Sequence, residues 1–173
     1  MIITNDGARA ERLRVIRGHG VSTRSYWHQV LGFNYRMSNI CGAIGLAQIE
    51  RIEATLARKR IIANHYRGLL SKLPVSLPTP IAGTTSSAWV ISCLLPAGVD
   101  RDLVQRAMLY DGVETRPVFY CAHHMPMYRS NVHLPVSEDI AARGLSLPSY
   151  PGLTEDEIST VVRSLQRAIE ASS

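Results

Sequence analysis

Lysine is scarce in this sequence: Lys59 and Lys72 are the only two among 173 residues. The formal net charge of +5 therefore rests on arginines, which are spread along the chain without a block of five or more like charges. The one basic cluster, "ARKR" at 57–60, falls within a helical pattern and is typical of a solvated helix face. Because nucleic-acid-binding proteins gather their basic residues on a patch or stripe, we expect no nucleic-acid partner.

Long hydrophobic runs and closely spaced cysteines are missing as well. No apolar run approaches the roughly 18 residues of a membrane span, and the first residues lack the basic and apolar regions of a signal peptide. Cys41, Cys93 and Cys121 are odd in number and far apart, which argues against a disulfide framework. With 46% hydrophobic and 19% charged residues, the sequence predicts a globular, cytoplasmic protein without a membrane partner.

The usual catalytic motifs are absent too. The sequence contains no G-x-S-x-G nucleophile elbow, no P-loop and no dinucleotide-binding glycine pattern. Cys41 could act as a nucleophile with His28 or His123 as its base. It lies beside Ile40 and Ile44 on an apolar helical face, however, which favours a buried small hydrophobic side chain.

The stretch "CAHHMPMYRSNVH" invites a zinc interpretation, because it holds Cys121, His123, His124 and His133. Their spacing matches no standard ligand pattern, and no second Cys/His pair lies nearby. We therefore expect no metal site here, and a substrate-side loop or a packed histidine instead.

The chain begins with irregular structure around one helix. Residues 1–4, "MIIT", are β-branched and closed by a turn signal, which predicts a strand. Such a strand would continue a sheet built earlier in a longer chain. Leu13 and Ile16 lie three apart in a short predicted helix that ends at Gly18. Residues 19–35 form an aromatic, polar loop of the length and kind that is usually functional.

A long helix is predicted next. Ser38 or Asn39 can cap it, and no proline follows until Pro74. A helix over 37–73, about 35 residues, would be about 50 Å long, more than a domain of this size needs. We expect it to bridge two domains or two subunits.

The rest of the chain, 74–173, predicts a small α+β unit. The capping box of Thr154 with Glu157 marks the start of the last helix. The other expected elements are strands at 75–77, 88–96 and 113–120 and helices at 100–112 and 137–143. Pro117 places its strand at an edge or a bend.

The sequence "GFNYR" stands where the long helix is predicted to begin. Asn34 and Arg36 would lie near unpaired N–H groups and the positive end of the helix dipole. An amide and a guanidinium at that place could hold a phosphate or carboxylate. Simple helix capping is the alternative.

Four blocks of the sequence match a known family in order and spacing. They are "YWHQVLGFNYRMSNICGAIGLAQIERI", "RKRIIANHYRGLL", "GVETRPVFYCAHHMPMYR" and "GLSLPSYPGLTEDEI". Together they resemble the C-terminal half of DegT/StrS-type pyridoxal-phosphate-dependent sugar-nucleotide aminotransferases, and most of all the perosamine-synthase-like group, which acts on 4-keto-6-deoxy sugars.

The resemblance implies an α/β to α+β fold, the C-terminal part of the aspartate aminotransferase fold (fold type I). Residues 1–36 would be a remnant of the large cofactor domain with an active-site loop. Residues 37–73 would form the bridging helix, and 74–173 the small α+β domain with a short, mostly antiparallel sheet. It also implies a homodimer, or pairing with a complementary large-domain chain, with the active site at the interface.

The same resemblance implies roles for four residues. Asn34 would donate to the phosphate of pyridoxal 5'-phosphate in the partner subunit. Tyr35 and Arg36 would support that contact or face the nucleotide-sugar substrate, and His123 would lie near the substrate. Cys121 departs from the family, in which proline is common at this position.

The Schiff-base lysine of the family precedes the segment that resembles "MIITND", so this chain does not contain it. Neither Lys59 nor Lys72, expected on an exposed helical face and its end, matches its context. We expect no catalytic residue in the chain and no transamination by the chain alone. The alternatives are a non-catalytic dimerisation or binding module for a full-length aminotransferase, and a remnant without a stable fold.

Overall fold

The computed structural model describes residues 2–172. The chain divides into two compact units, Met1–Arg51 and Ile52–Ser173, which we call unit 1 and unit 2 and describe separately. This boundary falls inside the segment 37–73, and the expected three-part division of the chain stays a prediction.

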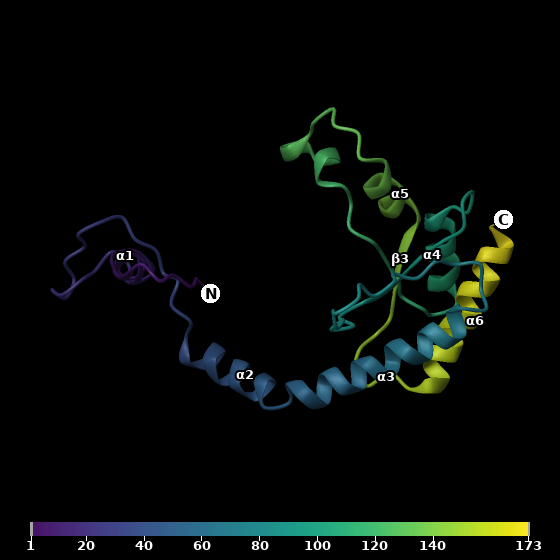
Figure 1. The fold of residues 1–173 in the computed structure, drawn as a ribbon, viewed down its shortest axis with the longest axis horizontal. Coiled ribbons are helices and arrows are strands. Elements are labelled where there is room, and N and C mark those ends of the chain that lie inside the picture. Colours follow the sequence, from purple (N-terminus) through teal and green to yellow (C-terminus); the bar gives the residue numbers. More distant parts are fainter. Residues whose placement is uncertain (1, 173) are drawn as a thin grey trace. The chain divides into compact units, whose positions relative to one another are not determined.

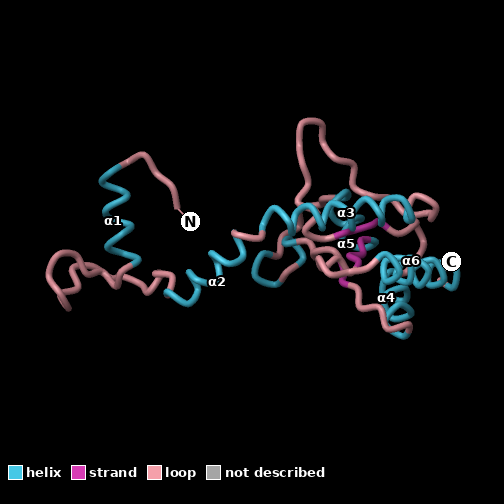
Figure 2. The backbone as a smooth tube through the Cα atoms, turned by 90° about the horizontal axis from the view of Figure 1, so that it is seen from below, coloured by secondary structure: helices cyan, strands magenta, loops and turns pink. Residues whose placement is uncertain are grey.

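Unit 1 contains two helices and a long loop (Figure 2). Helix α1, Gly7–Arg17, begins where Asp6 accepts a hydrogen bond from the Arg9 N–H at 3.0 Å, and Gly18 follows its end as predicted. The strand predicted at 1–4 is wrong for Ile2–Thr4, which form no strand, while Met1 lies outside the described residues. A β-branched run forms a strand only where a partner supplies a hydrogen-bonded ladder, and among the described residues this run has none.

The predicted long helix is divided into two. Helix α2, Asn39–Ile49, is capped by Ser38, and helix α3 spans Ile52–Leu70. At the junction the Arg51 N–H donates to the Gln48 carbonyl at 3.2 Å, a tighter turn than an α-helix makes. A single helix over 37–73 is therefore wrong. Its two halves share no buried face: α3 buries residues along its length, whereas α2 buries none.

Unit 2 is built around a three-stranded antiparallel sheet of order β1-β3-β2. The strands are β1, Ile91–Leu94, β2, Arg116–Pro117, and β3, Gly144–Leu147. The fold class is confirmed, and β2 lies at the edge as Pro117 predicts. The central strand β3 was not predicted from the sequence. The segment expected at 75–77 forms only an isolated bridge between Ser76 and Leu94.

Two helices of unit 2 begin with side-chain caps. Asp100 caps α4, Arg101–Tyr110, and α5 spans Pro135–Arg143. The capping box of Thr154 and Glu157 opens α6, Glu155–Ala171, as predicted. Helices α3 and α4 pack on α6, and β3 contacts α4 and α5 (Figure 1).

One hydrophobic core lies between the sheet and helices α3, α4 and α6. It includes Tyr66 of α3, Leu145 of β3 and Leu165 of α6, each fully buried. The Tyr66 hydroxyl donates to the Pro148 carbonyl at 2.8 Å, so the one polar group of this ring is satisfied. Among residues 2–172 no helix is long and apolar enough to cross a membrane.

Candidate functional site

The segment around Asn34 is held by the end of helix α1. The Phe33 N–H donates to the Ile16 carbonyl at 2.7 Å and the Tyr35 N–H to the Arg17 carbonyl at 3.1 Å. An isolated antiparallel bridge joins Gly18 to Asn34. Because these bonds fix the backbone, the side chains of residues 34–36 project from a defined base.

Close backbone contact shapes the base of this loop. A Cβ atom at Gly20 would lie 1.9 Å from the Val30 carbonyl oxygen, and one at Gly32 would lie 2.0 Å from the Gly20 nitrogen. Glycine is therefore required at both positions. His19 and Tyr26 have positive φ angles of 65° and 60°, a conformation that non-glycine residues adopt mainly where the surrounding structure enforces it.

The side chains of Asn34, Tyr35 and Arg36 are exposed. Within residues 2–172 none of the three makes a side-chain hydrogen bond or ion pair, although the Tyr35 ring stacks on Phe33 with 5.1 Å between centroids. Ser38 caps α2, accepting from the Cys41 N–H at 3.3 Å. Capping therefore does not explain Asn34 or Arg36, whose donors are left available to a ligand.

His123 lies in unit 2 and is 8% exposed. Its Nε2 is 3.0 Å from Glu138 of α5, and the same carboxylate accepts from the Leu134 N–H at 2.8 Å. His133 also approaches this carboxylate, with Nδ1 at 2.8 Å from Oε2. The Leu134 N–H, and then the two imidazoles, lower the pKa of Glu138. A carboxylate thus fixes the orientation of His123.

Lys59 is buried, which corrects the expectation of an exposed face at 57–60. It is 8% exposed, and its Nζ donates to the carbonyls of Trp89, at 2.8 Å, and Ser149. Burial lowers its pKa. Neighbouring Arg58 donates to the carbonyls of Pro151 and Leu153. The two cations thus donate to loop carbonyls that need hydrogen-bond partners. Of the two lysines, only Lys72 is exposed.

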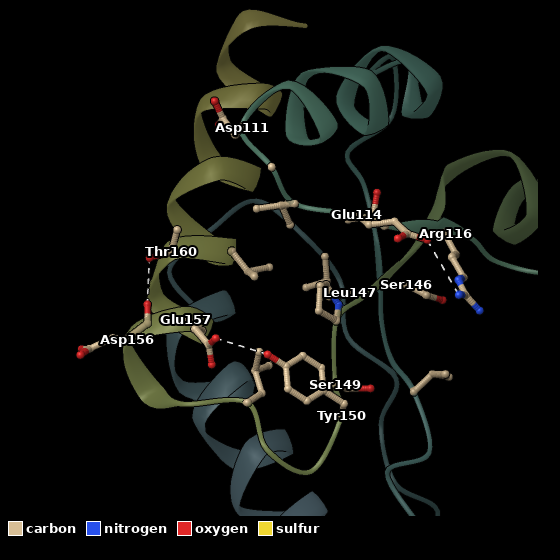
Figure 3. Close-up of a pocket in the computed structure, with 17 residues that line it drawn as sticks. Asp111, Glu114, Arg116, Ser146, Leu147, Ser149, Tyr150, Asp156, Glu157 and Thr160 are labelled. Atoms are coloured by element: carbon tan, nitrogen blue, oxygen red, sulfur yellow. Dashed lines mark hydrogen bonds and ion pairs between the residues drawn. The ribbon is translucent and has the colours of Figure 1, made fainter.

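Sequence reasoning missed a cavity of about 770 Å³, which lies beside β3 and the start of α6 (Figure 3). Among its polar groups, Tyr150 donates to Glu157 at 3.3 Å, and Arg116 lies 3.8 Å from Glu114. The hydroxyl of Thr115 is buried without a hydrogen-bond partner in the described chain. The capping box marked one wall of this cavity, but nothing in the sequence marked the hollow itself.

A family model matches residues 1–166, under the description DegT/DnrJ/EryC1/StrS aminotransferase family. The chain belongs to this aminotransferase family. It is 37% identical over 167 residues to a GDP-perosamine synthase of Escherichia coli O157:H7, a match that covers 95% of this chain and 46% of that protein. The chain thus spans about half the length of the curated relatives it matches.

Solved structures of the family share the fold. The aminotransferase TlmJ from Streptoalloteichus hindustanus superposes with a TM-score of 0.88 at 27% identity, covering 98% of this chain and 47% of that one. The S. venezuelae DesV structure, solved with a ketimine intermediate, superposes with a TM-score of 0.81 at 26% identity and covers 97% and 46%. The chain is thus a C-terminal portion of this aminotransferase fold.

Pyridoxal phosphate, on which the family depends, fits this chain only in part. The exposed amide of Asn34, on a fixed backbone, suits a phosphate oxygen. The covalent anchor does not fit: the Nζ of Lys59 is committed to carbonyl oxygens in the interior of unit 2, and Lys72 follows the end of α3. Asn34, Tyr35 and Arg36 belong to unit 1, and His123 belongs to unit 2.

Proposed function

We propose that this chain is the C-terminal portion of a pyridoxal-phosphate-dependent aminotransferase that acts on a nucleotide-linked keto-deoxy sugar. Amino-sugar synthesis in the cytoplasm, for a surface polysaccharide or a secondary metabolite, is the proposed role. The family match over residues 1–166, with relatives named GDP-perosamine synthase at 35–37% identity, carries this proposal.

The proposed roles of the site residues follow from the family resemblance. Asn34 donates its amide N–H to the cofactor phosphate of a partner subunit, and Tyr35 and Arg36 face the nucleotide sugar. The support is that all three side chains are exposed and that residues 33–35 are anchored to α1. His123, oriented by Glu138, stands on the substrate side. A homodimer, or pairing with a large-domain chain, completes the site.

In this proposal the chain does not transaminate by itself. Bound pyridoxal phosphate supplies an electron sink, and its use in transamination needs a lysine that forms the Schiff base and moves protons. Incubation with pyridoxal phosphate, reduction with borohydride and mass measurement of the protein test the point. We expect no stoichiometric adduct. A specific adduct at one lysine, together with turnover, would contradict the proposal.

Complementation tests the positive half of the proposal. The N-terminal half of the Escherichia coli O157:H7 GDP-perosamine synthase, co-expressed with this chain, should restore transfer of an amino group to a keto-sugar nucleotide. Asn34→Ala should weaken cofactor binding in the complex, whereas Asn64→Ala, an exposed asparagine of α3, should not. No activity in any combination, with both chains folded and associated, would sink the proposal.

The second candidate is a non-catalytic dimerisation or binding module for a full-length aminotransferase. The exposed apolar residues of α2 favour it: Ile40, Ile44, Leu46 and Ile49 are each at least 59% exposed. Co-purification with a full-length family member, without gain of activity from an N-terminal half, would select this candidate. Activity gained on mixing with such a half would select the first.

A further inference from the structure

Three metal-ligating side chains converge at one turn of unit 2. Among residues 2–172, Cys121, His123 and His124 each offer one ligand atom, and these atoms all lie within 4.8 Å of one another. Cys121 precedes the 3-10 turn η1, Ala122–His124, whose Cys121 carbonyl accepts from the His124 N–H at 3.0 Å. This turn brings together residues whose linear spacing resembles no standard ligand pattern.

Two of the three side chains are buried and one is exposed, so an ion could enter the cluster from solvent on the exposed side. Cys121 and His123 are each 8% exposed, and His124 is exposed. The two imidazole rings meet edge to face with 4.2 Å between their centroids. A cavity of about 490 Å³, lined in part by Cys121, His123 and Leu134, lies next to the cluster and leaves room for a further ligand.

A carboxylate already orients one of the ligands. Glu138 lies 3.0 Å from Nε2 of His123, which leaves the opposite ring nitrogen, Nδ1, to face an ion. Histidines that bind metals usually donate their other ring N–H to a carboxylate or carbonyl in this manner. Glu138 is itself fixed by the Leu134 N–H at 2.8 Å. The cluster therefore has an ordered outer contact as well as three ligands.

We propose that Cys121, His123 and His124 form a binding site for a borderline divalent cation, with Zn²⁺ as the best match. A thiolate with two imidazoles is a donor set that suits zinc, and three protein ligands leave the fourth tetrahedral position to water. Binding releases the thiol proton of Cys121 to solvent and involves no change of oxidation state. The inference concerns unit 2 alone and does not rest on the proposed function.

The test uses the full chain, treated with chelator and titrated with Co²⁺ as a spectroscopic probe, then with Zn²⁺ in competition. We expect one equivalent of Co²⁺ to give a thiolate-to-cobalt charge-transfer band that Zn²⁺ abolishes. Cys121→Ser should remove the band. His124→Ala, a change at an exposed side chain that the fold tolerates, should weaken binding at least tenfold. Glu138→Gln should weaken it by about 10- to 100-fold.

Two matched variants serve as controls. Cys41→Ser removes an exposed thiol of unit 1, and His65→Ala removes an imidazole of α3; neither should change the band or the affinity. Absence of a band in the wild-type chain would overturn the proposal. So would a band that persists in Cys121→Ser, or equal Co²⁺ affinities for His124→Ala and His65→Ala.

Discussion

The two units differ in how far their apolar residues are buried. In unit 2, the apolar positions of α6 are buried in a core shared with α3, α4 and the sheet. In unit 1, within residues 2–51, only Gly20 is buried, although α2 is rich in isoleucine and leucine. The side chain of Leu46 in α2 is 59% exposed, whereas that of Leu165 in α6 is fully buried.

This difference indicates where each unit obtains its stability. Unit 2 buries enough apolar surface to hold its helices by packing, which is the main source of helix stability in proteins. Unit 1 relies on caps, backbone bonds and two close-packed glycines. An exposed apolar face of the size that α2 presents is typical of a surface that meets another protein body. The side chains of residues 34–36, which precede α2 in the chain, are exposed as well.

The largest contrast is expected for leucine truncation. Leu165→Ala should lower the free energy of unfolding by about 3 kcal/mol, because it opens a cavity in a closed core. The matched change Leu46→Ala should alter it by less than about 0.5 kcal/mol. Urea unfolding followed by circular dichroism measures both. Equal losses would show that α2 shares the core's cooperativity.

The next largest loss of stability is expected for a substitution of Lys59. Lys59→Met removes the ammonium donor from the carbonyls of Trp89 and Ser149, at a cost of about 2 kcal/mol. The exposed Lys72→Met should cost almost nothing. The same unfolding assay measures the pair. A neutral Lys59→Met would mean that water replaces the ammonium at these carbonyls.

Alkaline pH should weaken unit 2 through Cys93. Burial raises the pKa of this thiol from 9.0 to about 12. Below pH 9.0 the Cys93 thiol is protonated in both the folded and the unfolded state, and its contribution to the free energy of unfolding is fully present. As the pH rises from 9.0 towards about 12, the unfolded state loses this proton while the folded state keeps it, so the free energy of unfolding falls. Cys93→Ala should reduce the alkaline slope of the unfolding free energy by up to about 1.4 kcal/mol per pH unit.

The matched variant for this experiment is Cys41→Ala, in which an exposed thiol of unit 1 is removed. The alkaline slope of its unfolding free energy should stay steeper than that of Cys93→Ala, because this variant keeps the buried Cys93 thiol. Lys59 and Tyr66, whose burial also shifts their pKa values, are present in both variants and therefore cancel in the comparison. Equal slopes for the two cysteine variants would contradict the burial of Cys93.

The smallest effect is expected at the helix caps. Thr154→Ala should cost about 1 kcal/mol, because it removes the capping box of α6. Ser38→Ala removes the cap of α2 and should leave the main unfolding transition unchanged, since α2 lies outside the core. Thermal unfolding compares them, with Thr160→Ala as a control within α6. If Thr154→Ala and Ser38→Ala lowered the temperature of the main transition equally, the two units would have to unfold together in one transition.

Local signals in the sequence predicted the helix starts well. Asp100, Thr154 and Ser38 cap helices as expected, since capping depends on a side chain and the few residues that follow. The edge position of β2 followed likewise from Pro117. Strand β3 was missed because "GLSL" is short, and its pairing with β1 and β2 depends on residues far away in the chain.

Non-local contacts explain the other differences. Lys59 looks like part of a solvated basic cluster until the loop carbonyls at 89 and 149 are placed beside it. No proline or glycine in the sequence predicts the break in the helix after Ile49. We attribute the break to the lack of a buried face common to α2 and α3. Asn34 and Arg36 were expected as ligands from their place before the predicted long helix and from the family resemblance, and Tyr35 from the resemblance alone. Their exposed side chains agree with a role outside the core.

Hydrogen exchange of the isolated chain, resolved by residue, tests most directly the claim that unit 1 depends on a surface that it does not itself provide. Amides of α6 and β3 should exchange only through global unfolding, whereas amides of α2 should exchange through frequent local opening. Addition of a complementing N-terminal half should protect α2 and leave α6 unchanged. Protection of α2 equal to that of α6 in the isolated, monomeric chain would contradict the account.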